Sequence, residues 1–385
     1  MRRAMILILL LALWALPAAA EALPASDALP ATDVLPASDV LPGLSCTGTM
    51  PLRFAEQFRV DYYEGGYKLL TIGDGSRYLV VPEGGRAPDG LGDVRILQQP
   101  LDAVYLAATS AMALFDAVDG LDAIRLSGAR AEGWAIPNAR AAMEAGRILY
   151  AGKYSEPDYE LLLSSGCDLA IESTMILHAP QVKEMIERLG IPVFIDRSSY
   201  ETHPLGRTEW VKLYAAMLNR EDAAAAFFDA QAAVLDGLAE TPNTEKTVAF
   251  FYFTSDGGVN VRSAKDYVPA MIELAGGRYA FRDSLPRDDG RSTVRLSMEE
   301  FYAAAVDADY LIYNGSIDTS VGSLDALLAK SPLLADFRAV KEGSVYATDS
   351  SLFQATDTVA QLIADIHRML TGGEGEMVFL RKLGD

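Results

Sequence analysis

Cysteine, histidine and basic residues are all scarce in this sequence. Its 385 residues include two cysteines and three histidines, and 33 lysines and arginines against 53 acidic residues give a formal net charge of −20. So acidic a chain argues against nucleic acid as a main partner, because phosphate binding needs a basic face. Direct capture of zinc or manganese is disfavoured, since His178, His203 and His367 are the complete histidine set. The sequence leaves open whether Cys46 and Cys167 pair.

Long apolar runs are also missing beyond the first twenty residues. Residues 1–20 have the pattern of a secretory signal peptide: Arg2 and Arg3, an apolar run from Ala4 to Leu16, and small residues before the cleavage site. An N-terminal membrane anchor is the alternative, but the run is shorter than the ~20 residues that a span needs. We therefore expect an exported protein, in the periplasm or at the extracellular surface.

The motifs of common enzyme classes are absent as well. The chain has no Gly-x-Ser-x-Gly elbow, no Walker loop, no His-Glu-x-x-His and no Gly-x-Gly-x-x-Gly that opens a helix after a strand. We expect a binding protein and no catalytic residues. An exported enzyme or a sensor on a two-lobed α/β scaffold remains the alternative from another class.

What is present is a proline-rich repeat followed by a globular composition. Leu-Pro-Ala-Ser-Asp and close variants recur between Leu23 and Gly43, and proline at every sixth residue excludes a helix. Residues 21–49 are therefore predicted to be an extended linker. Lipid attachment at Cys46 is disfavoured, because no aliphatic residue lies three positions before it. Hydrophobic residues make up 50% of the whole chain, enough for a sizeable core.

Beyond the linker, short apolar strands alternate with helical patterns, which is typical of parallel sheets covered by helices. A β-hairpin is predicted from Tyr67 to Val81, around Gly73-Asp74-Gly75-Ser76. The predicted strands of the first lobe, and then those of the second, are 104–107, 124–126, 148–150, 169–171 and 193–195, and 248–253, 310–313 and 345–347. The predicted fold class is α/β: two three-layer lobes joined by a long helix, with an N-terminal β-hairpin extension.

The domain boundaries follow from a change in amino-acid composition after the fifth predicted strand. Residues 207–240 are rich in Ala, Leu, Glu and Phe and contain no proline or glycine before Gly237, which predicts a connecting helical rod. The first lobe is therefore expected at residues 50–206 and the second lobe at residues 241–385.

Several stretches of the two lobes share a recurring layout. Residues 158–171, DYELLLSSGCDLAI, form a helix, a turn and a strand, and residues 189–193, LGIPV, lead into the next strand. In the second lobe, residues 296–301, LSMEEF, and residues 307–312, DADYLI, repeat this layout. Together they resemble the substrate-binding components of ABC importers for ferric siderophores, haem and cobalamin. Gly-Cys-Asp stands where that family commonly has Lys-Pro-Asp.

The resemblance covers roughly residues 104–370 and implies the partners. They are an ABC permease with its ATPase, and a small-molecule metal chelate as the transported ligand, with no resident cofactor; we expect a monomer. In this family each lobe presents one acidic residue to an arginine of the permease. By position these residues are Glu160 and Glu299, with Glu156 and Glu300 as the nearest substitutes. A carboxylate near a helix N-terminus is also favourable without a partner.

Ligand contacts are expected in loops that follow the carboxyl ends of strands, because these loops line the crevice of an α/β fold. The predicted ligand-binding residues are Lys153, Tyr154, Ser173, Thr174, Arg197, Tyr200, His203, Arg207, Tyr252 and Asn314. Structural alternatives remain open for them, since an arginine can pair with a surface acid and Ser173 and Thr174 can cap the next helix. His203 is either a ligand to haem iron or a hydrogen-bonded loop histidine.

The lysine and two arginines on these loops favour an anionic ferric siderophore-type chelate, because they supply charge-assisted bonds. Haem or cobalamin is the alternative ligand, which would depend on Tyr154, Tyr200, Trp134 and His203.

Overall fold

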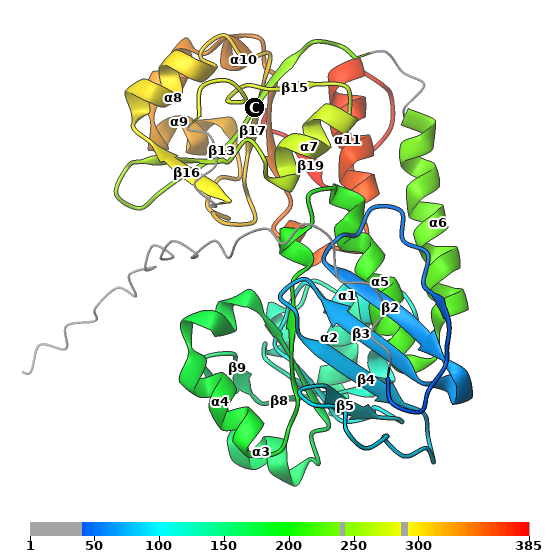
Figure 1. The fold of residues 1–385 in the computed structure, drawn as a ribbon. Coiled ribbons are helices and arrows are strands. Elements are labelled where there is room, and N and C mark those ends of the chain that lie inside the picture. The colour runs from blue at the N-terminus through cyan, green and yellow to red at the C-terminus, as the bar shows by residue number, and fades with distance from the viewer. Residues whose placement is uncertain (1–40, 239–242, 286–291, 385) are drawn as a thin grey trace, which may run out of the picture.

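The computed structural model describes residues 41–238, 243–285 and 292–384 (Figure 1). The signal peptide predicted at residues 1–20, and the linker up to residue 40, lie outside the described residues. Two α/β lobes follow one another along the chain, each with its own parallel-stranded sheet, and helix α6 runs beside them (Figure 1). The predicted class of two layered α/β lobes is confirmed.

The first lobe contains a five-stranded parallel sheet in the order β12–β11–β6–β7–β8. Its strands are β6 (Val104–Leu106), β7 (Ile124–Ser127), β8 (Leu149–Tyr150), β11 (Leu169–Ser173) and β12 (Val193–Asp196). The helices between them are α1 (Met112–Asp116), α2 (Pro137–Glu144), α3 (Tyr159–Ser164) and α4 (Pro180–Arg188). Apolar side chains fill both faces of this sheet, so the lobe has three layers and all five predicted strands are confirmed.

A second sheet precedes this lobe in the chain. Its strands, in spatial order, are β1 (Cys46–Thr49), β2 (Phe58–Tyr63), β3 (Lys68–Ile72), β4 (Arg77–Val81) and β5 (Arg95–Gln98). Strands β3 and β4 are the predicted hairpin, and Gly75 supplies its positive φ of 85°. The extension is larger than predicted, because the hairpin belongs to a five-stranded sheet. The linker predicted at residues 21–49 also extends too far at its C-terminal end, since β1 lies within it and Leu41 is already buried.

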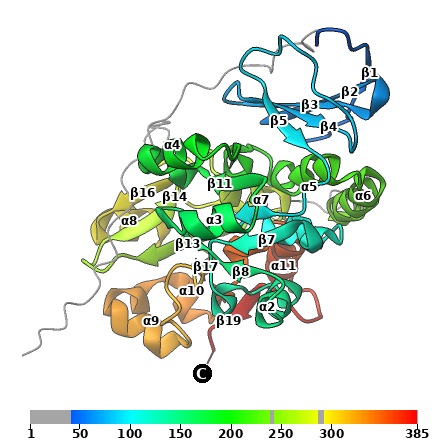
Figure 2. The same cartoon turned by 90° about the horizontal axis from the view of Figure 1, so that it is seen from below.

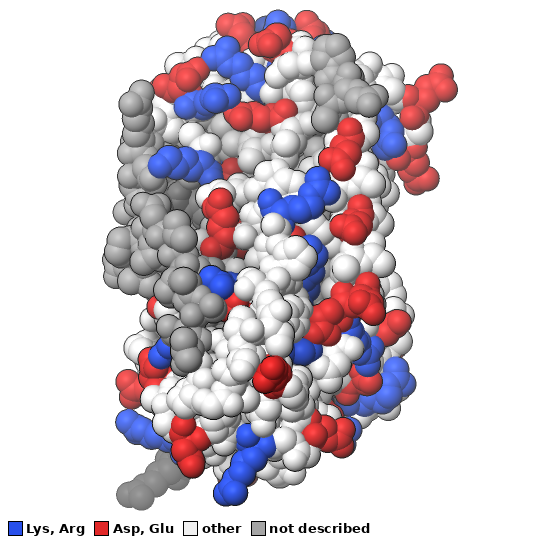
Figure 3. Space-filling view, turned by 45° about the vertical axis from the view of Figure 1, so that its right-hand side comes forward, with Lys and Arg blue, Asp and Glu red and all other residues white. Residues whose placement is uncertain are grey.

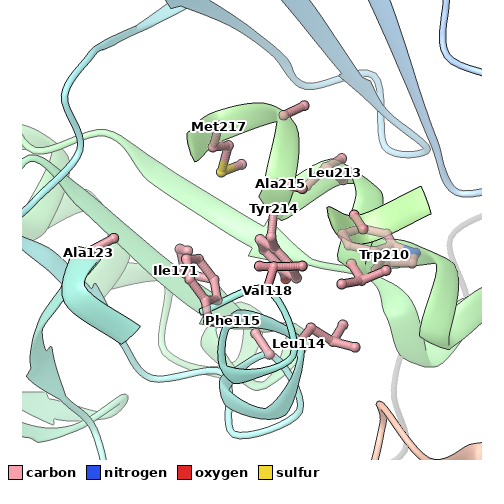
Figure 4. Close-up of a cluster of buried hydrophobic side chains, with 14 of the residues drawn as sticks. Leu114, Phe115, Val118, Ala123, Ile171, Trp210, Leu213, Tyr214, Ala215 and Met217 are labelled. Carbon is pink, nitrogen blue, oxygen red and sulfur yellow. The ribbon is translucent and has the colours of Figure 1, made fainter. Parts of the chain in front are cut away.

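Helix α5 (Pro204–Leu218) is buried on nearly every side. It lies between the N-terminal sheet and the rest of the first lobe (Figure 2). Its Trp210 and Tyr214 converge with Leu114 and Phe115 of α1 in one apolar cluster (Figure 4). Apolar residues all around a helix are typical of a helix at the centre of a core.

The predicted rod at residues 207–240 is two helices. Helix α5 ends at Asn219, which has a left-handed φ of 58° and accepts a hydrogen bond at Oδ1 from Lys68 Nζ at 2.8 Å. Asparagine tolerates this conformation better than most residues, so the chain turns here before α6 (Glu221–Leu238) begins. Only α6 runs between the lobes, and the boundary predicted at Arg207 falls inside α5 of the first lobe.

The second lobe is built on a seven-stranded mixed sheet. In spatial order its strands are β16 (Thr293–Leu296), β14 (Val259–Arg262), β13 (Thr247–Phe253), β17 (Tyr310–Tyr313), β18 (Val345–Thr348) and β19 (Leu380–Lys382), with β15 (Arg278–Tyr279) beside β13. The central parallel strands β13, β17 and β18 were predicted. The other four were missed because they are short or only partly buried. The helices are α7 (Tyr267–Leu274), α8 (Met298–Ala305), α9 (Leu324–Lys330), α10 (Arg338–Lys341) and α11 (Val359–Thr371).

Candidate binding site between the lobes

The two lobes meet along the carboxyl ends of their parallel strands. Gln354, after β18, donates through Nε2 to the carbonyl oxygen of Gly133 at 2.7 Å and accepts at Oε1 from the N–H of Ala135 at 2.8 Å. The hydroxyl of Thr208 on α5 donates to the carbonyl oxygen of Thr356 at 2.8 Å. The loop with Gly133 follows β7, and α5 follows β12. The carboxyl edges of the two sheets therefore face one another, which is where α/β folds bind ligands.

Arg197, directly after β12, is the strongest binding candidate. Its residue is 6% exposed, its guanidinium carbon lies 4.4 Å from the centroid of the Tyr200 ring, and its Nε has no acceptor among the described residues. A buried guanidinium without a counter-ion is costly, so an arriving anion would offset that cost with charge-assisted hydrogen bonds. The structure thus brings together Arg197 and Tyr200, two of the predicted residues.

Arg207 reaches the second lobe from the first turn of α5. Its guanidinium carbon lies 4.0 Å from the centroid of the Tyr267 ring, and the residue is 8% exposed. It lines a cavity of about 20 Å³ between the lobes, and Arg197 does not. Such a volume holds about one water-sized species. In this arrangement of the lobes, Arg207 therefore has no space beside it for a metal chelate.

His203 is the N-cap of α5. Its Nδ1 accepts the N–H of Leu205 at 3.1 Å, and its ring stacks on Phe54 with the centroids 4.0 Å apart. Burial lowers the pKa of the imidazole, which favours the neutral form that can accept this bond. These contacts support the loop-histidine interpretation. Trp134 is also structural in character, because it is fully buried and donates to the hydroxyl of Ser127 at 3.1 Å.

Lys153 and Tyr154 follow β8, and neither lines the cavity between the lobes. Lys153 is exposed in a two-strand hairpin, where its ammonium pairs with Glu156 at 3.3 Å. Tyr154 is half-buried and packs on the apolar cluster under α3 and α4. Lys153 therefore has the contacts of a surface residue, and Tyr154 has those of a residue at the edge of the core.

The remaining predicted ligand-binding residues form hydrogen bonds with residues near them in the fold. The Ser173 hydroxyl accepts the main-chain N–H two residues later at 3.3 Å and caps the 3₁₀ helix that starts at Thr174. The buried Asn314 accepts at Oδ1 from the hydroxyl two residues later at 2.6 Å. Tyr252 is half-buried, and its hydroxyl accepts from the side-chain amide of Asn260 at 2.8 Å. Each of these strand-end residues thus already holds a local hydrogen bond.

Glu160 and Glu299 lie in the first turns of α3 and α8, and both are exposed. Within the described ranges, neither carboxylate has a hydrogen bond or an ion pair. Glu300, a substitute for Glu299, accepts the N–H of Ser297 at 2.8 Å in a capping box. Helices α3 and α8 lie away from α6 in two views (Figures 1 and 2). The geometry leaves Glu160 and Glu299 available to a partner.

Glu172 is a buried acid of the first lobe that directly follows the strand predicted at residues 169–171. Strand β11 in fact continues through Ser173, which carries Glu172 into the layer with Tyr105, where it is 0% exposed. Neither carboxylate oxygen has a partner among the described residues, and burial raises the pKa to about 8. An acid directly after the apolar run Leu-Ala-Ile was the available signal.

The raised pKa of Glu172 predicts a falling stability between pH 4.5 and about 8. In that window the unfolded chain releases a proton that the folded chain keeps, so each pH unit costs the folded state about 1.4 kcal/mol. Glu172→Gln should flatten this slope and stabilise the protein at pH 8 by a few kcal/mol, with little change near pH 4.5. Urea unfolding at several pH values measures this pH dependence of the free energy of unfolding. The exposed Glu132→Gln is the control, and equal slopes in both variants would contradict the assignment.

Cys46 is exposed and Cys167 is buried, and both are free thiols, so they do not pair. Burial raises the pKa of Cys167 to about 12. In the part of the chain that the structure describes, no three His, Cys, Asp or Glu side chains gather as a set of metal ligands.

The sequence profile of the family described as "Periplasmic binding protein" matches residues 129–352, more than half of the chain. The chain belongs to this family. Its members are the non-enzymatic substrate-binding components of ABC importers, which work outside the cytoplasm with a permease and an ATPase. The enzyme alternative is therefore set aside. Among the described residues, no helix combines the length and apolar character that a membrane span requires.

Individual relatives agree with this assignment. An uncharacterized lipoprotein of Methanocaldococcus jannaschii is 25% identical over 352 residues, which cover 83% of this chain and 82% of the relative. The fold is similar to that of the periplasmic haem-binding protein of Vibrio cholerae, with a TM-score of 0.56, 19% identity and coverage of 68% of this chain and 96% of that one. The periplasmic vitamin B12 binding protein of Vibrio cholerae gives a TM-score of 0.51 at 16% identity, with 72% and 99% covered.

Proposed function

We propose that this protein captures a ferric siderophore-type chelate and delivers it to an ABC importer. The observation that carries the proposal is Arg197, a buried guanidinium for which the described residues supply no counter-ion, at the carboxyl edge that faces the second lobe. The negative oxygens of a chelate would supply that counter-ion. The ring of Tyr200, already stacked on Arg197, adds an aromatic surface for the organic part of the chelate.

The overall charge makes a local positive site necessary for such a ligand. A net charge of −20 repels an anion at long range. Around α6, acidic and basic side chains are interspersed and form no broad basic field (Figure 3). An anionic chelate would therefore be held by short-range contacts with buried cations, which the Arg197 position offers.

Haem or cobalamin is the second candidate, because structural neighbours bind these ligands according to their descriptions. The contacts of His203 count against an axial-ligand role, since its Nδ1 accepts a backbone N–H and its ring stacks on Phe54. Trp134 is buried and therefore offers no stacking wall. The contacts of His203 and the burial of Trp134 thus favour the chelate over the macrocycles.

A calorimetric panel of a ferric catecholate, a ferric hydroxamate, haem and cobalamin tests the proposal. We expect one ferric chelate to bind with 1:1 stoichiometry. Arg197→Ala should then weaken its binding tenfold or more, because charge-assisted bonds are lost. The exposed Arg125→Ala removes the same charge from the same lobe and should leave affinity unchanged. Tighter binding of haem or cobalamin than of either chelate would overturn the ligand assignment.

For delivery, we propose that Glu160 and Glu299 contact arginines of the permease, one from each lobe. Their exposure and lack of partners within the described residues support this role. We also propose export by the signal peptide at residues 1–20. Lipidation at Cys46 is disfavoured, because Leu41 is buried and the carbonyl oxygen of Ser45 accepts the N–H of Glu64 at 3.0 Å. Residues 41–45 are thus part of the fold.

A further inference from the structure

The cavity between the lobes contains two buried polar groups without partners. Arg207 and Thr356 line it from opposite lobes and are 8% and 2% exposed. Arg207 Nε and Thr356 Oγ1 have no hydrogen-bond partner among the described residues. Unsatisfied buried groups are rare in folded proteins and call for an explanation. Two of them beside one cavity indicate a missing ligand.

The charged side chains around the Tyr267 ring, which lines the cavity, leave a net positive charge. Arg262 is close, since its guanidinium carbon lies 5.4 Å from the centroid of the Tyr267 ring, but it is neutralised by Asp266 through hydrogen bonds of 2.9 and 2.6 Å. Arg207 contacts the same ring and has no acidic partner within the described ranges. These three charged side chains sum to one positive charge. A water molecule would satisfy hydrogen bonds here but would not neutralise that charge.

The size of the cavity limits the size of the ligand that it can hold. About 20 Å³ admits one water-sized species, whereas pockets for organic ligands measure roughly 300–1,000 Å³. The other lining residues are largely apolar and include Met271, Leu352 and Phe379. An apolar lining disfavours strongly hydrated ions. We propose that Arg207 and Thr356 bind a small, weakly hydrated monatomic anion of the halide class, such as chloride.

Such an anion would join the two lobes. Arg207 belongs to α5 of the first lobe, whereas Thr356 precedes α11 of the second. The hydroxyl of Thr208, the residue after Arg207, already donates to the carbonyl oxygen of Thr356. A ligand that binds only the folded, assembled lobes stabilises them by mass action. This role goes beyond capture of the cargo and does not depend on which chelate is bound.

Thermal unfolding in sodium gluconate, chloride and bromide at constant ionic strength tests the proposal without any cargo. We expect chloride and bromide to raise the midpoint by about 2–4 °C above gluconate once their concentration is well above Kd. Arg207→Met and Thr356→Val should abolish this difference. Arg125→Met removes an exposed arginine of the same lobe that does not line the cavity, and this variant should keep the difference.

Anomalous diffraction from a bromide-soaked crystal of the wild type provides a test independent of the variants. We expect a bromide peak within hydrogen-bonding distance of Arg207. Equal midpoints in gluconate and chloride, an anion effect that persists in Arg207→Met, or a cavity without a bromide peak would each overturn the proposal. Cargo binding measured in gluconate buffer keeps this outcome separate from that of the proposed function.

Discussion

Replacing Glu209 by alanine is expected to lower the free energy of unfolding by about 3–5 kcal/mol, because it breaks a buried ion pair and removes the acceptor of the main-chain N–H groups of residues 53–55. Glu209 is 0% exposed and accepts the main-chain N–H groups of Arg53, Phe54 and Ala55 at 2.8–3.1 Å. It also accepts from Lys212 Nζ at 2.8 Å. The substitution would leave three N–H groups and a buried ammonium without this acceptor.

Urea unfolding measures the loss, and hydrogen exchange of residues 53–57 locates it. The matched control is Asp236→Ala, which removes an exposed acid that pairs with the guanidinium of Arg53 at 3.5 Å. Surface pairs of this kind contribute about 0–1 kcal/mol. If Glu209→Ala were no more destabilising than Asp236→Ala, the carboxylate would not be what anchors the N-terminal sheet to α5.

Charge reversal at Glu160 and Glu299 together is expected to abolish the stimulation of the permease-bound ATPase while ligand affinity stays within a few-fold. Both carboxylates are exposed, one on each lobe, in the first turns of α3 and α8. Charge pairs at a docking surface set the orientation and the rate of encounter, and like charges across it are strongly unfavourable. Two lysines facing two permease arginines would therefore prevent docking.

ATPase activity in proteoliposomes, with calorimetry of the chelate alongside it, is the appropriate measurement. Glu132→Lys with Glu342→Lys makes the same charge change at one exposed acid of each lobe and should retain stimulation. Normal stimulation by the Glu160 and Glu299 double variant would rule out these two residues as the docking pair. A loss in both double variants would show that net charge matters rather than position.

The parallel strands of both lobes could be predicted because they are buried on both faces and therefore read as short apolar runs. Strands β14, β16 and β19 could not, since half-exposed strands of three or four residues have too little pattern to separate them from loops. The sharpness of the turn at Asn219 could not be predicted either, because the flanking sequences are both strongly helical. Its left-handed φ depends on a tertiary contact with Lys68.

The candidate site was predicted in part. The rule that ligands bind in loops after the carboxyl ends of strands led to Arg197 and Tyr200, which the structure places at a strand's carboxyl end facing the other lobe. It could not distinguish them from Ser173 or Asn314, whose side chains are occupied by bonds two residues along the chain. Residue type alone does not reveal whether a polar group is already satisfied. That distinction requires the three-dimensional structure.

The buried acids were missed for a related reason. In sequence, Glu201 and Glu209 look like two more of the many surface carboxylates. In the fold, Glu201 accepts from Trp210 Nε1 at 2.7 Å and from the N–H groups of Glu56 and Gln57 at 2.7 and 3.1 Å. Their donors come from a segment about 145 residues earlier, and a contact of that range leaves no local pattern.

Uptake of a radiolabelled ferric chelate by proteoliposomes that contain the cognate permease and ATPase tests the central claim most directly. The account predicts ATP-dependent accumulation of intact chelate only when this protein is present, with little accumulation when the Glu160 and Glu299 double reversal replaces it. Accumulation that is equally fast without the protein, or recovery of a chemically altered chelate, would contradict its assignment as the binding component of an importer.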